Sequence, residues 1–189
     1  MMDMKKIAIF ASGNGSNFQA IINEIEKGAL PAEIAVLVTD NPRCFAVERA
    51  RCHNITVFSF IPKNYATKEE YEKAIAFFLI EKSVSLIVLA GYMRLVGEVL
   101  LSAFPHRIIN IHPALLPAFP GKNGIQQAYN YGVKVFGVTV HYVDSGMDTG
   151  KIIAQECFKA EGTETLEEIE QKIHGIEHQL YSRVIREIL

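Results

Sequence analysis

The sequence has few cysteines, and their spacing does not suit a disulfide framework or a zinc site. Cys44, Cys52 and Cys157 cannot all pair with one another, and they form neither a CxxC spacing nor a Cys/His cluster. We therefore expect no metal ion and interpret the three side chains as reduced thiols of a cytoplasmic protein.

The sequence also lacks an excess of one charge and any long hydrophobic run. Nineteen Lys and Arg against twenty-one Asp and Glu give a formal charge of −2, so no strong field exists to hold nucleic acid. The N-terminus leads only into the short apolar run 7–11, and no stretch reaches the roughly 18 apolar residues of a membrane helix. Partners are expected to be small molecules, with neither nucleic acid nor a membrane among them.

No internal repeat, linker or charge run divides the chain. Its 189 residues, 49% of them hydrophobic, suit a single core. We therefore interpret residues 1–189 as one domain with an N-terminal half of about 1–100 and a C-terminal half of about 101–189.

Short apolar runs alternate with amphipathic segments along the chain. Strands are predicted at 6–11, 32–39, 56–58, 86–90, 108–112, 135–142 and 151–158. Helices are predicted after residues 12–17, over 45–52, and after capping-box sequences at Thr67 and Thr165. This order predicts an α/β fold: a doubly wound, mostly parallel open sheet with a long C-terminal helix.

The long closing helix is expected to pack on the sheet through one apolar stripe. Its members recur at helical spacing: Leu166, Ile169, Ile173, Ile176, Leu180, Val184 and Ile188. Glu177 follows Ile176 in sequence and lies about 100° round the helix, at the edge of this stripe.

A glycine-rich loop, residues 12–17, connects the first predicted strand to the first helix. Glycines permit a tight turn there, and the unpaired amides of a helix N-terminus favour an anion such as phosphate. Phe18 stands where a dinucleotide fingerprint needs its third glycine, and no Lys-Ser/Thr pair follows as in a P-loop. The residues alone also fit a plain turn in which Ser16 or Asn17 caps the helix.

Asn110 and His112 are two residues apart on a predicted strand, so their side chains leave from the same face. Ligands of open α/β sheets bind at the carboxyl ends of strands. A carboxamide there can donate to a developing oxyanion, and an imidazole can move protons near neutral pH. Asp148, in a later loop, can pair with His112 and favour its protonated form.

Spacing alone equally allows structural roles for these residues. Asn110 then bonds a loop, His112 is a satisfied core histidine, and Asp148 is a turn former. His141 lies inside a predicted strand and is interpreted as a packing histidine.

Four segments resemble the phosphoribosylglycinamide formyltransferase family, which is folate-dependent. Residues 110–117 (Asn-Ile-His-Pro-Ala-Leu-Leu-Pro) are similar to the formyltransferase signature, and residues 137–150 follow at the expected distance. Residues 12–17 and 90–94 add to the likeness, which extends from about 6 to 188. The resemblance implies a formyltransferase-like fold, with phosphate binding in the first half of the domain and catalysis and folate binding in the second.

The family resemblance also implies an activity and residue roles. The activity is formyl transfer from the co-substrate 10-formyltetrahydrofolate to the amine of 5'-phosphoribosylglycinamide, in de novo purine biosynthesis. The implied roles are oxyanion and formyl contacts by Asn110, proton transfer by His112 and its tuning by Asp148. The implied substrate-binding residues are Gly15, Ser16, Asn17 and Glu177, and the implied folate-binding residues are Lys68, Met93, Arg94, Leu95, Val96 and Asn110. The resemblance allows a homodimer.

Three alternatives remain at this stage. A methionyl-tRNA formyltransferase and a formyltetrahydrofolate deformylase share the Asn/His/Asp centre, but each resembles this core with an extra domain, for which 189 residues leave no room. The absence of a basic tail further disfavours tRNA. The third alternative is a nucleotide-binding regulator that keeps the glycine loop without catalysis.

Overall fold

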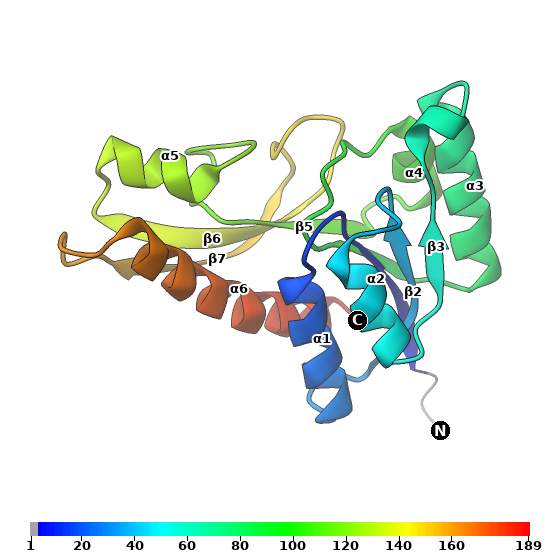
Figure 1. Cartoon of the computed structure of the whole chain (residues 1–189), viewed down its shortest axis with the longest axis horizontal. Helices are drawn as coiled ribbons and strands as arrows, with labels where there is room; N and C mark the ends of the chain where they lie inside the picture. Colours follow the sequence, from blue (N-terminus) through cyan, green and yellow to red (C-terminus); the bar gives the residue numbers. More distant parts are fainter. Residues whose placement is uncertain (1–3) are drawn as a thin grey trace.

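The computed structural model describes residues 4–189 and contains a seven-stranded sheet with helices on both faces (Figure 1). The strands are β1 (Lys5–Phe10), β2 (Ala32–Thr39), β3 (Val57–Ser59), β4 (Leu86–Leu89), β5 (Ile108–His112), β6 (Val135–Tyr142) and β7 (Ile152–Lys159). The helices are α1 (Ser16–Glu26), α2 (Phe45–Cys52), α3 (Lys68–Glu81), α4 (Glu98–Ala103), α5 (Gly124–Tyr131) and α6 (Leu166–Ile188), with a 3₁₀ turn at Pro62–Asn64.

The strand order is β3-β2-β1-β4-β5-β6-β7. Strands β1 to β5 pair in parallel, whereas β6 is antiparallel to both β5 and β7. The predicted doubly wound, mostly parallel sheet is therefore confirmed. The order reverses between β1 and β4, and such a switch point is where open α/β sheets form ligand crevices.

Each face of the sheet has its own hydrophobic core. Helices α1, α2 and α6 pack on one face through residues such as Phe18, Ala46 and Leu180. Helices α3 and α4 pack on the other face through residues such as Ile75 and Leu100. Since both faces of the parallel strands are covered, β4 is apolar without alternation, as its sequence indicated.

Local capping signals set the starts of two helices. Thr165 forms the predicted capping box of α6 with Glu168. Thr67 accepts from the amide of Glu70 at the start of α3, but the Glu70 carboxylate accepts from Ala66 rather than from Thr67. Both caps satisfy helix amides that have no intrahelical partner.

Two helices and one buried position differ from the sequence-based expectation. The sequence pattern does not predict α4, and α5 occupies a stretch that gives no clear pattern. Ile176 is only partly buried, whereas Ile173 is fully buried and Tyr181 and Ile185 join the buried face of α6. The buried face of α6 is therefore turned away from Ile176, toward Ile173 and Tyr181.

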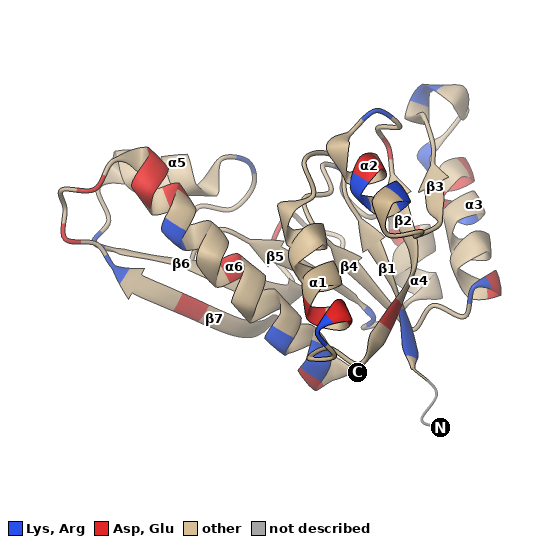
Figure 2. Ribbon diagram, turned by 60° about the horizontal axis from the view of Figure 1, so that its bottom comes forward, with Lys and Arg blue, Asp and Glu red and all other residues tan. Residues whose placement is uncertain are grey.

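Charged side chains are interspersed rather than segregated. Helices α2, α3 and α6 each carry both Lys or Arg and Asp or Glu (Figure 2). Among the helices of residues 4–189, none is long and apolar enough to cross a membrane.

Candidate active site

The glycine loop ends in Gly15, which is the N-cap of α1 with φ 75 and ψ 35. This left-handed conformation suits glycine, and no side chain caps the helix. The alternative in which Ser16 or Asn17 is the N-cap is therefore wrong. The first-turn amides of α1 are left without a side-chain acceptor, which is the arrangement that an anion requires.

The loop lies against the segment that follows β4, at the switch point of the sheet. The amide of Ser12 donates to the carbonyl of Gly91 at 3.1 Å, and the amide of Met93 donates to the Ser12 hydroxyl at 3.0 Å. These contacts place the expected phosphate-binding loop directly beside the expected folate-binding segment 93–96.

The four residues of segment 93–96 differ in exposure. Met93 is 64% exposed and Leu95 is 50% exposed, so both offer apolar surface. Arg94 is partly exposed but pairs with Asp40. Val96 is buried in the core with Leu100, so its side chain offers almost no exposed surface.

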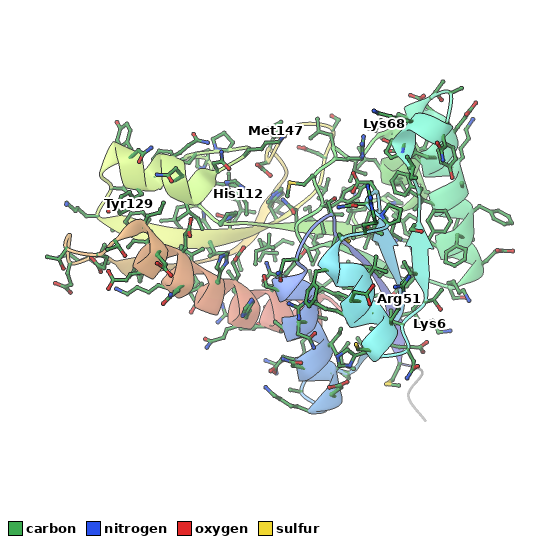
Figure 3. All side chains as sticks on the ribbon, viewed as in Figure 1. Lys6, Arg51, Lys68, His112, Tyr129 and Met147 are labelled. Atoms are coloured by element: carbon green, nitrogen blue, oxygen red, sulfur yellow. The ribbon has the colours of Figure 1, made fainter. Side chains whose placement is uncertain are left out.

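Lys68 lies beside the same segment although it belongs to α3. A Cβ added to Gly97 would come within 2.9 Å of the Lys68 Cε, so these two residues are close neighbours. Figure 3 shows Lys68 well separated from His112. Lys68 therefore belongs to the surroundings of segment 93–96 and not to the cluster around His112.

Asn110, His112 and Asp148 come together at the end of β5, as predicted. His112 Nδ1 lies 3.4 Å from Asp148 Oδ2, and Asn110 Nδ2 donates to Asp148 Oδ1 at 3.3 Å. His112 is 3% exposed. Both contacts to Asp148 are at the long end of hydrogen-bonding distance.

His141 is a fourth member of this cluster, and its interpretation as a mere packing histidine is wrong. Its Nδ1 donates to the carbonyl of Tyr142, and its Nε2 lies 3.2 Å from Asn110 Nδ2 and 3.5 Å from Asp148 Oδ1. The signal that could have found it is strand register, since Asn110 stands opposite His141 in the antiparallel β5–β6 pair.

The carboxylate of Asp148 has several donors. Burial alone would raise its pKa, but hydrogen bonds from His141 and from the Gly121 amide, with the charges of His112 and His141, lower the pKa below its ordinary value. The Gly121 amide donates at 2.8 Å, so the loop after β5 also holds the carboxylate. Asp148 is therefore a negative charge fixed between two histidines.

The loop that presents Asp148 needs two glycines. A Cβ on Gly150 would overlap the carbonyl oxygen of Tyr142, and a Cβ on Gly146 would overlap the hydroxyl of Thr149. Asp144 closes the turn by accepting from the Gly146 amide and the Thr149 hydroxyl. Asp148 itself has φ 55, so this loop imposes an uncommon backbone conformation on the residue that contacts His112.

His112 also contacts the loop that follows it. Its Nε2 donates to the carbonyl of Phe119 at 2.8 Å, because a carbonyl oxygen can only accept. The two ring nitrogens of His112 therefore face the Phe119 carbonyl and the Asp148 carboxylate. Met147 is half exposed at this side of the molecule, near Gly121 and His112 (Figure 3).

Glu177 is buried and accepts from His174 Nδ1 at 2.7 Å, which raises the pKa of His174. One turn later, the Tyr181 hydroxyl lies 2.8 Å from the Leu89 carbonyl and 3.1 Å from the Ile109 carbonyl. This part of α6 is thus attached to the carboxyl end of β4 and to the first half of β5.

The cluster around His112 offers protonated nitrogens and a carboxylate. These groups can donate hydrogen bonds to a developing oxyanion, hold a proton and return it. Within residues 4–189, no group of three His, Cys, Asp or Glu side chains is arranged to hold a metal ion.

Comparisons with known proteins agree on one family. A model described as formyl transferase matches residues 5–185. The phosphoribosylglycinamide formyltransferase of Bacillus subtilis (strain 168) is 53% identical over 186 residues, covering 98% of this chain and 95% of that protein. The phosphoribosylglycinamide formyltransferase of Haemophilus influenzae is 37% identical, with 97% of this chain and 86% of that protein covered.

A solved structure gives the same result. Glycinamide ribonucleotide transformylase 1 from Geobacillus kaustophilus is 51% identical, with a TM-score of 0.96 and coverage of 99% of this chain and 100% of that chain. The resemblance seen in the sequence motifs is thereby confirmed, and the chain belongs to the formyl transferase family.

Proposed function

We propose that the chain transfers the formyl group of 10-formyltetrahydrofolate to the amine of 5'-phosphoribosylglycinamide, a step of purine biosynthesis. Relatives that are 53% and 37% identical over nearly the whole chain carry the name of this activity. The observation that supports the reacting centre is the partly buried cluster of Asn110, His112 and Asp148 at the carboxyl end of β5, in which His112 is the buried member.

The reaction places a negative charge on the formyl oxygen and requires proton transfer between nitrogen atoms, so the site must stabilise that charge and move a proton. The amine nitrogen attacks the formyl carbon, so the carbonyl becomes a tetrahedral centre with a negative oxygen. Protonated His112 and the carboxamide of Asn110 stabilise this oxygen. The carbon–N10 bond then breaks, N10 takes up a proton, and the former amine loses one, which leaves an amide and tetrahydrofolate.

The reactive groups must exchange partners when substrates bind. Both polar ends of the His112 ring are occupied, by Asp148 and by the carbonyl of Phe119. The Asn110 amide nitrogen faces Asp148 and His141 at 3.3 and 3.2 Å. We therefore propose that the segment carrying Phe119 moves and that Asn110 gives up one long contact, while Asp148 keeps His112 charged.

The remaining contacts are assigned by position. Gly15, Ser16 and Asn17 are assigned to the phosphate, because their backbone amides lie at the N-terminus of α1, which has no side-chain cap. Glu177 is assigned to the ribose hydroxyls. Lys68 and segment 93–96 are assigned to the folate.

Turnover with and without the acceptor tests this proposal. Release of tetrahydrofolate from 10-formyltetrahydrofolate is expected only when phosphoribosylglycinamide is present. Turnover without acceptor would instead indicate a deformylase, and binding without turnover would indicate a regulator. His112→Asn should abolish turnover, while His106→Asn is the matched control, because His106 is exposed and its φ of 56 is tolerated by asparagine.

Cytoplasmic location and a homodimer are also proposed. Strand β7 is an edge of the sheet, and Val135 and Ile152 are exposed on β6 and β7. Pairing of β7 with a second copy would cover the edge strand that carries Ile152, whereas Val135 lies on the inner strand at the other end of the β6–β7 ladder. Sedimentation of the purified protein at several concentrations tests for the dimer.

A further inference from the structure

Helix α2 lies directly behind the glycine loop although it follows that loop by some thirty residues. The amide of Ala46 donates to the carbonyl of Gly13 at 3.1 Å. A Cβ on Gly15 would lie 2.9 Å from the Ala46 Cβ, so the two backbones approach closely. The loop is therefore supported from behind by the first turn of α2.

Arg49, in the second turn of α2, makes the most extensive contacts with this loop. Its Nε donates to the carbonyl of Asn14 at 2.9 Å, and its Nη2 donates to the Asn14 side-chain oxygen at 3.0 Å. Its Nη1 donates to Gln19 Oε1 in α1 at 3.0 Å. The planar guanidinium thus joins the loop and the helix that the loop starts.

The orientation of Arg49 is itself constrained. Its guanidinium lies 4.7 Å from the centre of the Phe45 ring, which restricts its rotamer. No carboxylate within residues 4–189 forms an ion pair with it, so its charge is not offset by a neighbouring acid. All its polar contacts are to neutral oxygens of the loop and α1.

We propose that Arg49 is a positioning residue for the phosphate-binding loop. By holding the Asn14 carbonyl against α2, it turns the following amides toward the open end of α1, where the phosphate is proposed to bind. The planar guanidinium of Arg49 donates two hydrogen bonds in a fixed geometry to Asn14. A lysine ammonium group cannot reproduce this pair of contacts. This inference rests on the proposed function, because that function assigns the phosphate to the loop.

Steady-state kinetics of Arg49→Gln, Arg49→Lys and a matched control provide the first test. Arg51→Gln is the control, because Arg51 is on the same helix, is exposed and pairs with Glu48 on that helix. Arg49→Gln should raise KM for phosphoribosylglycinamide about tenfold or more, with KM for the folate changed less than about twofold. Arg49→Lys should be nearly as damaging, and Arg51→Gln should match the wild type.

Three kinetic results would overturn the proposal. Full rescue by Arg49→Lys would mean that only the positive charge matters. An equal rise in both KM values would indicate a general structural loss. Unchanged kinetics of Arg49→Gln would mean that the loop holds its shape without the contact.

Hydrogen exchange of the protein without substrate gives a second readout that does not depend on the reaction. Peptides covering residues 12–18 should exchange faster in Arg49→Gln than in the wild type, and Arg51→Gln should not differ. Unchanged exchange would overturn the positioning role. If the wild type shows no turnover at all, the proposed function fails, whereas the exchange data still decide whether Arg49 orders the loop.

Discussion

Arg94 Nε donates to Asp40 Oδ2 at 2.7 Å, and the other oxygen of the same carboxylate accepts from the Ser12 hydroxyl at 2.6 Å. Asp40 therefore ties the start of the glycine loop to the segment proposed to hold the folate. The charge of Arg94 is already matched by a carboxylate, so attraction of distant folate carboxylates is a small part of its role. We therefore expect Arg94 to act mainly by positioning segment 93–96.

Asp40→Asn and Arg94→Gln should therefore have similar effects. Both remove the same charge-assisted hydrogen bond, so each should raise KM for 10-formyltetrahydrofolate by about three- to tenfold, with little dependence on salt. Kinetics at low and high ionic strength check this. If Arg94 instead attracts the folate carboxylates, only Arg94→Gln will be harmful, and Asp40→Asn will lower KM at low salt.

Gly15→Ala should weaken binding of phosphoribosylglycinamide more than binding of the folate. The reason is structural: the new Cβ would lie 2.9 Å from the Ala46 Cβ, and φ at this residue is +75. Gly13→Ala is the matched control in the same loop, because a Cβ at Gly13 would meet nothing within 4 Å and its φ is not in the left-handed region. Isothermal titration measures the Kd of each variant for each substrate. If Gly15→Ala and Gly13→Ala have the same Kd for phosphoribosylglycinamide, the phosphate assignment is wrong.

Asp148→Asn should lower kcat by at least about 10²-fold while both substrates still bind. The change keeps the size of the side chain and removes the charge between His112 and His141. Loss of this charge removes the carboxylate partner of His112 Nδ1, so the proton transfer assigned to His112 should slow while substrate binding persists. A near-normal kcat would leave Asp148 only a turn residue.

The same variant should change how stability depends on pH. The folded-state pKa of Asp148 lies below its ordinary value of 3.8, so its ionised form stabilises the fold above that value. This contribution is lost as the pH falls through the lower folded-state pKa. Urea unfolding gives the free energy of unfolding of the wild type and of Asp148→Asn. The difference between the two free energies should be smaller at about pH 3 than at about pH 7. A constant difference would contradict the shift.

Ile173→Ala should destabilise the protein by about 2–5 kcal/mol, because Ile173 is fully buried under the sheet. Ile176→Ala removes the same atoms from a partly buried position, so it should cost less than half as much. Denaturant midpoints of the two variants measure the difference. Equal midpoints would mean that the buried face of α6 is centred elsewhere.

Structural features that depend on residues close together in the sequence can be predicted from it. The apolar run of β4, the Thr165 capping box and the glycine loop each depend on residues within a few positions of one another. Helix α5 gives no such signal, because it is short and its N-cap residue Asn123 has φ 60 and makes no side-chain cap contact. The Asn110–His112 pair is predictable because a strand places alternate side chains on one face.

The amino-acid sequence by itself determined the seven strands, four of the helices (α1, α2, α3 and α6), the family motifs and the three polar residues at the end of β5 and in the loop after β6. Only the tertiary structure decided that His141 joins Asp148, that Arg94 is paired with Asp40 and that Arg49 holds Asn14. The physical reason is distance along the chain. Local geometry follows from adjacent residues, whereas strand register and helix packing bring together side chains whose separation in sequence carries no periodic signal.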